Sequence, residues 1–599
     1  SGQLWVVLGC GGDRDAAKRP LMGAIAAQHA DRVWVTSDNP RSERPESIVA
    51  QILLGLVDNR QVDVEVDRAL AIRGAIGRAA AVDVVLVAGK GHEATQEIAG
   101  VRHAFSDVDH ASQALQAWKP LPKVDAAAPM GPLSQLAAWL DGARVVGDAS
   151  TACLRVHTDT RSITNGDLFV ALRGERFDAN DLLHDAQARG ASAVLCHAGL
   201  GDAAYPQDLP RIEVADTRAA LAQLAIRWRA QFDLPVIAVT GSNGKTTVTQ
   251  MVAAILDAQA PAGQAMATQG NYNNDIGVPL TLLRLRPHHR LAVVELGMNH
   301  PGEIAVLAAM AQPTVALVNN AQREHLEFMH TVEAVAQENG NVLAALPATG
   351  VAVFPQDDAY TAVWRKLAAS RRSVEFSAET DSAAEVVCTE AQWAQGAWAV
   401  QARSPQGALS YRLAIAGRHN VKNSLAAAAC ALAAGVSPDA VNQGLSAFKP
   451  VKGRCRTTQL VQGNVNCTLV DDTYNANPDS VQAAIAMLAE LPAPRMLVLG
   501  DMGEVGEQGP AFHAEAGRAA REQGLEHVLV LGALAAHVLD GNPAALHFAT
   551  MDELLVRAQA VLPQVASVLV KGSRFMRMER VVEAFGYPVP QTEGLRDVA

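Results

Sequence analysis

Residues 235–247 read Pro-Val-Ile-Ala-Val-Thr-Gly-Ser-Asn-Gly-Lys-Thr-Thr, and this stretch restricts the fold of the chain more than any other. An apolar, β-branched run passes into small residues at Thr240, and an alanine-rich run with helical spacing follows the two threonines. The pattern predicts a buried strand, a tight turn and a helix. Such a turn points backbone N–H groups and a helix N-terminus at one place, which is typical of a phosphate-binding loop.

The residue types in the turn indicate nucleotide binding. Gly241 and Gly244 let the backbone approach an anion, Lys245 would neutralise phosphate charge, and Thr246 is placed to ligate Mg²⁺. The general phosphate-loop pattern has glycine where this chain has Val239, and a glycine-rich turn with an exposed lysine is the alternative. Because lysine and two threonines follow the second glycine directly, we expect a nucleoside triphosphate. The expected contacts are Gly241, Ser242, Asn243, Gly244, Lys245, Thr246 and Thr247.

Composition excludes several classes of protein. The hydrophobic content of 49% indicates a folded chain, and the net charge of −12 without a basic patch argues against nucleic acid as a partner. The 7 cysteines are scattered without a Cys-x-x-Cys pair, which favours a reducing cytoplasm over a disulfide framework or zinc site. No apolar run reaches membrane length, so membrane insertion is not expected.

Strand-like and helical runs alternate along the chain, which predicts a multidomain α/β protein with mainly parallel, doubly wound sheets. Strands are expected at 5–8, 32–36, 82–87, 236–239, 291–294, 315–319, 468–470, 496–499, 528–531 and 567–570, and a helix at 423–434. The expected domains are 1–120, 133–232, the central nucleotide-binding domain 233–447, and 448–599. A Pro- and Ala-rich linker is expected at 121–132, where Met130 resembles the former start of a separate protein.

Further motifs accompany the phosphate loop in a fixed order. They are Asp159-Thr160-Arg161, Asn271-Tyr272-Asn273-Asn274-Asp275-Ile276-Gly277, Glu295-Leu296-Gly297-Met298-Asn299, Glu324-His325-Leu326-Glu327, Gly417-Arg418-His419-Asn420-Val421-Lys422-Asn423, Tyr474-Asn475-Ala476-Asn477-Pro478, Gly500-Asp501-Met502 and Lys571-Gly572-Ser573-Arg574. As an ordered set they resemble the Mur ligases, and within that family the MurF branch. The resemblance covers residue 130 to about 587 and implies a cytoplasmic ligase that uses ATP and Mg²⁺ to join D-alanyl-D-alanine to UDP-N-acetylmuramoyl-tripeptide in peptidoglycan precursor synthesis.

Residues 2–118 carry a different set of motifs. These are Gly9-Cys10-Gly11-Gly12-Asp13-Arg14-Asp15, Lys18-Arg19-Pro20-Leu21-Met22, Asp38-Asn39-Pro40-Arg41 and Gly89-Lys90-Gly91-His92-Glu93. They resemble the C-terminal domain of the MurE branch, which adds the third amino acid. The whole chain therefore resembles a piece of a MurE–MurF fusion. Since it contains a single phosphate loop, we expect it to run only the second of the two ligations.

The resemblance also implies roles for particular residues. A ligase of this kind phosphorylates a carboxylate, and an amine then attacks the acyl phosphate, so the protein mainly supplies positioning and positive charge. Lys245, Glu295 and His325 are the expected catalytic residues, with Thr246, Glu295 and His325 as metal ligands. A capping carboxylate and a packed loop histidine are the alternatives for Glu295 and His325.

The chain departs from the family at one position near this site. Many Mur ligases carry a carbamylated lysine downstream of the histidine, which supports the metal site. The corresponding stretch 335–342 reads Val-Ala-Gln-Glu-Asn-Gly-Asn-Val and has no lysine. Gln337, Glu338 and Asn339 are the candidates to take its place.

Further ligand contacts follow from the same resemblance. Asn420 and Asn423 would contact the nucleotide, and Arg454 would reach its phosphates from the last domain, which requires domain closure. The expected substrate contacts are Thr160, Arg161, Asn271, Asn273, Asn274, Tyr474, Asn477 and Lys571. Helix capping, Asx turns and ordinary loop polarity are the alternatives for these residues.

The first domain is expected to recognise meso-diaminopimelate. The resemblance implies Arg14, Asp38, Asn39, Arg41, Gly89 and Glu93 as its contacts, with the Arg41 guanidinium suited to a carboxylate and Glu93 to an ammonium. An idle remnant, a scaffold for other cell-wall precursor enzymes and a module that captures tripeptide substrate are the alternatives. For the whole chain, the alternative is a relative of folylpolyglutamate synthase, against which the Asn-Tyr-Asn-Asn and Tyr-Asn-Ala-Asn-Pro stretches argue.

Overall fold

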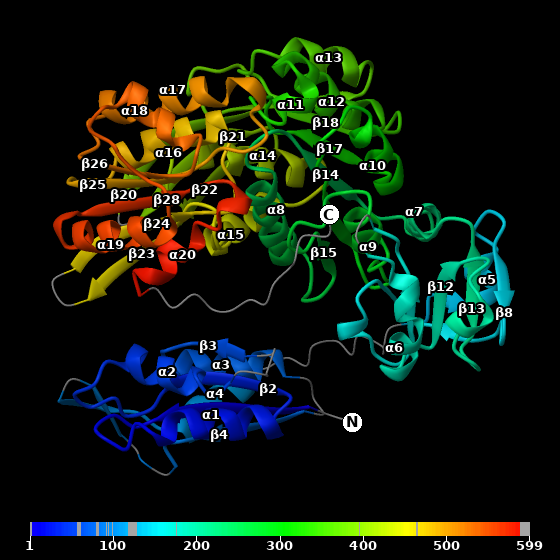
Figure 1. Ribbon diagram of the computed structural model, residues 1–599, viewed down its shortest axis with the longest axis horizontal. Helices are drawn as coiled ribbons and strands as arrows, with labels where there is room; N and C mark the ends of the chain where they lie inside the picture. Colours follow the sequence, from blue (N-terminus) through cyan, green and yellow to red (C-terminus); the bar gives the residue numbers. More distant parts are fainter. Residues whose placement is uncertain are drawn as a thin grey trace. The chain divides into compact units, whose positions relative to one another are not determined.

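The computed structural model describes residues 3–56, 62–79, 83–91, 93, 95–98, 100–117, 128–174, 177–394, 396–462 and 465–586 (Figure 1). The chain divides into two compact units, one within residues 1–126 and the other within residues 127–587. Among the described residues, no helix is both long and apolar enough to cross a membrane.

The first unit is a four-stranded parallel sheet with helices on both faces. Its strand order is β3-β2-β1-β4. One face buries Leu8, Val35 and Ile48 under two helices, and the other buries Trp5 and Trp34 under two more. The strands are β1 (Leu4–Cys10), β2 (Arg32–Ser37), β3 (Val62–Val64) and β4 (Val84–Ala88), the helices are α1 (Lys18–His29), α2 (Pro45–Leu53), α3 (Arg68–Arg78) and α4 (Asp107–Ala117), and β5 (Thr95–Ile98) and β6 (Val101–Ala104) form a hairpin.

The second unit begins with a five-stranded sheet of order β10-β11-β12-β13-β8, in which only β8 runs antiparallel. Its elements are β7 (Gly131–Pro132), α5 (Leu133–Ala137), β8 (Arg144–Val146), β9 (Ala152–Cys153), β10 (Arg155–His157), β11 (Asp167–Val170), α6 (Leu183–Ala188), β12 (Ala193–His197), β13 (Arg211–Val214) and α7 (Thr217–Arg229). The C-terminal end of the expected linker is part of this sheet region. Met130 is buried in one apolar cluster with Leu133 and Leu136, and the strand that follows it, β7, pairs with β9. The remainder of the linker, residues 121–127, lies outside the described residues.

A nine-stranded sheet of order β15-β16-β14-β17-β18-β19-β20-β21-β22 follows, and its last two strand pairs are antiparallel. The strands are β14 (Val236–Thr240), β15 (Ala265–Ala267), β16 (Leu291–Glu295), β17 (Val315–Val318), β18 (Val351–Pro355), β19 (Arg372–Ser377), β20 (Val386–Ala394), β21 (Ala397–Ser404) and β22 (Gly407–Leu413). The helices are α8 (Lys245–Gln259), α9 (Gly277–Leu282), α10 (Glu303–Ala311), α11 (Leu326–Met329), α12 (Val332–Ala344), α13 (Thr361–Ala368), α14 (His419–Ala433) and α15 (Pro438–Ala447).

The last sheet has six strands in the order β23-β24-β28-β25-β26-β27, parallel except for the β23–β24 hairpin. Its elements are β23 (Arg456–Gln462), β24 (Val465–Asp472), α16 (Pro478–Ala489), β25 (Arg495–Gly500), α17 (Gly509–Glu522), β26 (His527–Leu531), α18 (Val538–Gly541), β27 (Leu546–Phe548), α19 (Met551–Val561), β28 (Ser567–Lys571) and α20 (Glu579–Ala584). The strands predicted from the sequence are present, most of them one to several residues longer than the apolar runs.

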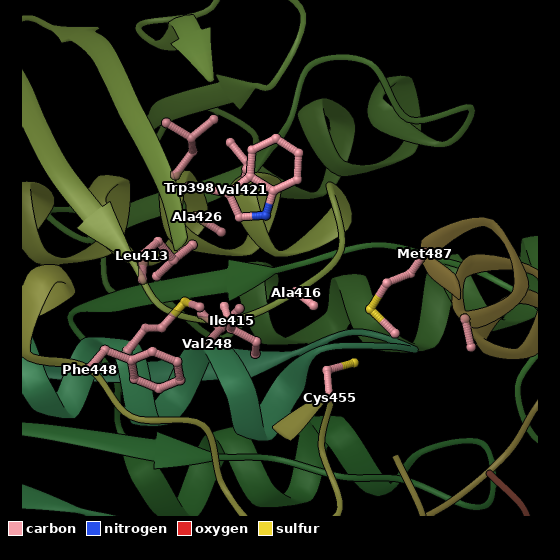
Figure 2. Close-up of a cluster of buried hydrophobic side chains, with 14 of the residues drawn as sticks. Val248, Trp398, Leu413, Ile415, Ala416, Val421, Ala426, Phe448, Cys455 and Met487 are labelled. Atoms are coloured by element: carbon pink, nitrogen blue, oxygen red, sulfur yellow. The ribbon is translucent and has the colours of Figure 1, made fainter. Parts of the chain in front are cut away.

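One apolar cluster joins the nine-stranded and six-stranded sheet regions. Figure 2 shows Val248 of α8, Val421 and Ala426 of α14 and Met487 of α16 within it. Helix α8 begins at Lys245, directly after the phosphate loop, and α14 packs on it.

Candidate nucleotide and ligation site

The phosphate loop leaves the carboxyl end of β14, which lies between β16 and β17. Gly241 and Gly244 have φ angles of 129° and 82°, a region that favours glycine. The loop then enters α8 at Lys245, so the first-turn N–H groups of the helix lie at the loop. The strand, turn and helix lie where the sequence predicts them.

Lys245 is held by the loop and by a buried carboxylate. Its Nζ donates to the carbonyl oxygens of Gly241 and Ser242 at 2.7 and 3.1 Å and to Glu324 Oε1 at 2.6 Å. Burial opposes ionisation of Glu324, but the charges of Lys245 and His325 hold its pKa below the ordinary value. An anion bound at the loop would therefore compete with Glu324 for Lys245.

Glu295 ends β16 next to the start of α8 and is only 1% exposed. Thr246 Oγ1 and Asn273 Nδ2 donate to its Oε1 at 3.1 and 2.8 Å, whereas Oε2 is buried and accepts no hydrogen bond from any described residue. A buried carboxylate is costly unless a cation balances it, and carboxylate and hydroxyl oxygens suit Mg²⁺. Glu295 and Thr246 therefore fit a magnesium ion.

The described residues include no group of three or more His, Cys, Asp or Glu side chains arranged to hold a metal. A magnesium ion at Glu295 and Thr246 would thus take its other ligands from water and phosphate oxygens, which is its usual mode in nucleotide sites.

His325 lies just before α11 in a left-handed backbone conformation, with φ of 49°. Its Nδ1 is 2.6 Å from Glu504 Oε2 and its Nε2 is 3.5 Å from Glu324 Oε1. Burial lowers the pKa of His325, but the two carboxylates more than offset this effect and raise it to about 9. His325 thus lies as a cation between two carboxylates. Metal ligation would need the neutral imidazole with Nε2 free, and a carboxylate at Nδ1, such as Glu504, is the kind of partner that orients a metal-ligating histidine.

The stretch that lacks the family lysine contacts the phosphate loop from behind. Asn339, buried on α12, accepts from Thr240 Oγ1 at 2.5 Å and from the Gly241 N–H at 3.1 Å. Glu338 instead accepts from the Ile304 N–H at 2.9 Å at the start of α10. Of the three candidates, Asn339 is thus the one whose hydrogen bonds reach the loop.

Asn420 and Asn423 lie in the first turns of α14. Asn423 Nδ2 donates to Asn420 Oδ1, and Asn319 Nδ2 donates to Asn423 Oδ1, both at 2.9 Å. Asn319 Nδ2 also donates to the Asn243 carbonyl oxygen at 2.8 Å, and a Cβ on Gly244 would lie 2.7 Å from Asn423 Oδ1. The structure therefore brings Asn423 to the phosphate loop, with Asn420 buried behind it.

The six-stranded region contacts the same loop. Asn477 at the start of α16 donates from Nδ2 to Asn243 Oδ1 at 2.9 Å. Arg323 donates to Asp479 Oδ1 at 2.7 Å and to Glu515 Oε2 at 2.8 Å, joining the loop before α11 to α16 and α17. These contacts hold the last sheet against the nucleotide side of the central sheet.

Two further residues expected at this boundary have other partners. The Arg454 guanidinium lies 4.0 Å from the centre of the Tyr474 ring. Lys571 is 3% exposed and donates to Asp472 Oδ2 at 2.6 Å and to the Asn475 carbonyl oxygen at 2.9 Å. In this arrangement Lys571 is almost fully buried and orients the loop that carries Tyr474 and Asn477.

The remaining expected substrate contacts separate into two groups, one at 271–274 and the other at 160–161. Asn273 reaches Glu295, and its backbone N–H donates to the Asn271 carbonyl oxygen at 2.7 Å. Asn274 Oδ1 instead accepts from the Gly277 N–H at 2.8 Å and caps the start of α9. Thr160 is buried, and Arg161 is paired with Asp159 at 2.6 Å, in the five-stranded region.

In the first unit, the expected diaminopimelate contacts lie on the loops that follow β1, β2 and β4. The parallel strands bring these loops to one edge of the sheet. Arg41 Nη1 donates to the Gly12 carbonyl oxygen, and Asn39 Nδ2 donates to Glu93 Oε2. Arg14 is exposed on the loop after β1. The structure thus brings Asn39, Arg41 and Glu93 together.

Two other residues of this set have structural constraints of their own. A Cβ on Gly89, whose φ is 112°, would lie 2.4 Å from the Gly9 carbonyl oxygen, so this position requires glycine. Asp38 is buried, its Oδ1 accepts no hydrogen bond from the described residues, and burial raises its pKa. A ligand ammonium would supply the donor that Asp38 lacks.

Sequence reasoning assigned no role to Glu324, Glu504 or Arg323. Glu324 contacts Lys245 and His325, Glu504 contacts His325, and Arg323 joins the neighbouring loop to α16 and α17. Glu324 belongs to the motif Glu324-His325-Leu326-Glu327, so the sequence alone could have indicated it as a site residue. Glu504 and Arg323 carry no local signal, because their partners are distant in the chain; Arg323 and Asp479, for example, are 156 residues apart.

Comparison with known proteins places this site in a family. The sequence matches the family described as Mur ligase middle domain over residues 239–431, the Mur ligase family catalytic domain over 155–229, and the Mur ligase glutamate ligase domain twice, over 1–91 and 453–574. The UDP-N-acetylmuramoyl-tripeptide--D-alanyl-D-alanine ligase of Escherichia coli is 41% identical over 447 residues, which cover 74% of this chain and 95% of that protein. The Haemophilus influenzae ligase of the same name is 38% identical, with the same coverage.

Solved structures give the same picture. A crystal structure of MurF from Acinetobacter baumannii has a TM-score of 0.71 at 35% identity and covers 77% of this chain and 99% of that one. MurF from Thermotoga maritima in complex with ADP has a TM-score of 0.63 at 26% identity and covers 72% and 96%. A Mycobacterium tuberculosis folylpolyglutamate synthase complexed with ADP, at 18% identity and a TM-score of 0.51, covers 62% and 94% and shares the fold alone.

The phosphate loop, the buried carboxylate beside it and the parallel sheets define an ATP-dependent ligase of the α/β class. The chain belongs to the Mur ligase family, and its similarity is to the MurF-type enzymes of peptidoglycan biosynthesis.

Proposed function

We propose that this chain joins D-alanyl-D-alanine to UDP-N-acetylmuramoyl-tripeptide in the cytoplasm, with cleavage of ATP to ADP and phosphate. The observation that carries the proposal is the match to the Escherichia coli ligase, because it spans 95% of that protein without loss of the phosphate loop or of Glu295 here. The fold-level likeness to folylpolyglutamate synthase is much weaker in sequence.

The reaction needs an activated carboxylate. The tripeptide carboxylate would attack the γ-phosphorus of ATP, which releases ADP and forms an acyl phosphate, and the amine of D-alanyl-D-alanine would then displace phosphate. Lys245 and the N-terminus of α8 would balance charge on the phosphates, while Thr246 and Glu295 would hold Mg²⁺, which screens the same charge when bound. His325, kept cationic by Glu324 and Glu504, would add positive charge at the edge of the site.

A test of the site is phosphate release with ATP, UDP-N-acetylmuramoyl-tripeptide and D-alanyl-D-alanine. We expect release only when all three are present, and a loss of about 10³-fold or more in Lys245→Ala, since electrostatic stabilisation of phosphoryl transfer is the main catalytic term. Lys366→Ala, which removes an exposed lysine on α13, serves as the control. Near-normal turnover in Lys245→Ala would contradict the assignment.

For the first unit, we propose that it recognises the meso-diaminopimelyl residue and derives from a MurE-type ligase in a MurE–MurF fusion. The match of the glutamate ligase domain to residues 1–91 supports the ancestry, and the buried Asp38 beside the Asn39, Arg41 and Glu93 cluster supports recognition.

Deletion of residues 1–120 distinguishes this proposal from its alternatives. A raised KM for the tripeptide substrate, reproduced by Arg41→Ala but not by Lys18→Ala, would support capture of the diaminopimelyl group. Unchanged kinetics would favour a scaffold for other precursor enzymes or an idle remnant.

A further inference from the structure

The first unit repeats part of the six-stranded region of the same chain. Its strand order β4-β1-β2-β3 corresponds to β28-β25-β26-β27, and all of these strands are parallel. The registers agree as well: Val6 pairs with Leu86 and Leu8 with Ala88, as Leu497 pairs with Leu569 and Leu499 with Lys571. Leu86 of β4 therefore corresponds to Leu569 of β28.

The two regions differ at one edge. In the six-stranded sheet, β24 pairs in parallel with β28, and α16 packs on β25, β28 and α17. Among the described residues of the first unit, no strand pairs with the outer edge of β4. Leu569 is fully buried, whereas Leu86 is 51% exposed and Val84 is 61% exposed.

The exposed side chains of β4 lie on the face that carries α1. Val85 and Val87 pack in the cluster of Trp5 and Trp34, and Ala88 packs in the opposite cluster with Leu8. Because side chains alternate along a strand, Val84 and Leu86 lie on the same face as Ala88.

Helix α1 is exposed on the side where α17 is covered. Gly23 and Gly517 mark equivalent places, since a Cβ on either would lie 2.3 or 2.1 Å from a backbone oxygen of the next helix. Counted from these glycines, Met22 corresponds to Ala516 and Ile25 to Ala519. Ala516 is buried in the cluster that contains Val481 and Ile485 of α16, and Ala519 packs against it.

In contrast, Met22 and Ile25 are large, exposed apolar residues. Together with Val84 and Leu86 they form what we name the β4 patch. Each member stands where the six-stranded region is covered by β24 or α16.

We propose that the β4 patch is a docking surface for a strand–helix segment of the β24–α16 type from a Mur ligase C-terminal domain. The strand would run parallel to β4 along its free edge, and the apolar face of the helix would cover Met22, Ile25 and Leu86. This surface is separate from the residues proposed for catalysis, so the inference does not rest on the proposed reaction.

The register also specifies one feature of the docking strand. Asp472 of β24 lies opposite Lys571 of β28 and forms an ion pair with it, but the residue of β4 at that place is Ala88. A carboxylate there would be buried without a partner, which is costly. The docking strand is therefore expected to carry an uncharged residue at that position.

The test introduces a cysteine into the β4 patch and adds a copy of the strand–helix segment to the same chain. In the full chain, Leu86→Cys introduces a thiol on an exposed strand, whereas the seven native cysteines are all buried. Residues 465–494 are joined ahead of Leu4, as they precede Arg495 in the six-stranded region, with Asp471→Ala and Asp472→Ala in the added copy. The control is the same addition with Ile485→Asp and Leu488→Asp in the copy, which removes the apolar face of the helix.

We expect the alkylation rate of the introduced thiol to fall by about tenfold or more with the added segment and to change by less than about twofold with the control, because docking would limit reaction to open states. Amide exchange of Val84 to Ala88 should slow in parallel. Unchanged reactivity with the added segment would overturn the proposal. Protection of the introduced thiol without any added segment would also overturn it, and a rise of that protection with protein concentration would indicate a second copy of the chain.

Discussion

The Asn339 side chain is hydrogen-bonded to Thr240 and Gly241, where the phosphate loop begins. Its Oδ1 accepts from Thr240 and from the backbone of Gly241, so it fixes the point at which the chain leaves β14. The sequence alone left three residues that could take the place of the family's carbamylated lysine, because the position of a residue in a helix does not reveal which neighbouring element its side chain contacts. The contacts distinguish them: Asn339 faces the loop and Glu338 caps α10.

Asn339→Leu should raise the KM for ATP by about tenfold, because it leaves the Thr240 hydroxyl and the Gly241 N–H without a buried acceptor, at a cost of about 1–3 kcal/mol. Steady-state kinetics with ATP varied would measure this change. Gln337→Leu, on the exposed side of the same helix, is the matched control and should leave the KM unchanged. An unchanged KM in both variants would show that the loop keeps its shape without Asn339.

Glu43 gives the first unit a pH dependence. The Arg19 guanidinium, which is buried, and the Asp13 N–H hold the pKa of Glu43 at about 2, below its ordinary value of 4.5. Because the folded-state pKa is the lower one, this stabilisation is fully present above about pH 4.5 and is lost as the pH falls through about 2.

Pepsin digestion of the full chain between pH 4.5 and 2 would measure this effect through fragments from residues 3–117. We expect the original chain to become more susceptible toward pH 2 and Glu43→Gln to be susceptible throughout, with little further change. Equal pH dependence in the two proteins would mean that other carboxylates dominate acid unfolding.

At the scale of elements, the close packing of helices behind the phosphate loop limits the size of the side chains that α15 can carry where it meets α8. Helices α8 and α15 approach so closely that a Cβ on Gly444 would lie 2.4 Å from Ile255 Cα. Helix α8 carries Lys245 and Thr246 at its other end, so its placement against α15 and α14 sets the position of the loop.

Gly444→Ala should destabilise the second unit by about 1–3 kcal/mol through overpacking, even though alanine favours a helix. Urea unfolding of the full chain measures the change in the free energy of unfolding. Gln443→Ala, one residue earlier and exposed, is expected to be neutral or slightly stabilising. Equal stability of the two variants would mean that α15 can shift away from α8 without cost.

The central parallel strands of three sheets could be predicted from the sequence, because β-branched runs such as 236–239 and 567–570 are apolar on both faces and end at glycine or polar residues. The strands of the five-stranded sheet were not predicted individually, because they are only three to five residues long. The strands β20 to β22 were also not predicted, since their alternating pattern exposes one face and lacks a long apolar run. The site follows the same division. Residues that follow a strand, such as Glu295, could be located, whereas the pairing of Lys245 with Glu324 depends on how distant loops meet.

For the whole molecule, the central feature is that the number of glutamate ligase domains differs from the number of phosphate loops. Two regions match the glutamate ligase domain of the family, but only one phosphate loop is present in the sequence. A ligation that requires ATP can therefore be carried out by the second unit, whereas the first unit has no phosphate loop in its sequence.

The most direct test of this account gives the purified chain ATP and Mg²⁺ with two substrate pairs at once. One pair is UDP-N-acetylmuramoyl-tripeptide with D-alanyl-D-alanine, and the other is UDP-N-acetylmuramoyl-dipeptide with meso-diaminopimelate; mass spectrometry identifies the products. The account predicts the pentapeptide product formed from the first pair and no tripeptide product from the second. Tripeptide product, or no pentapeptide product, would contradict it.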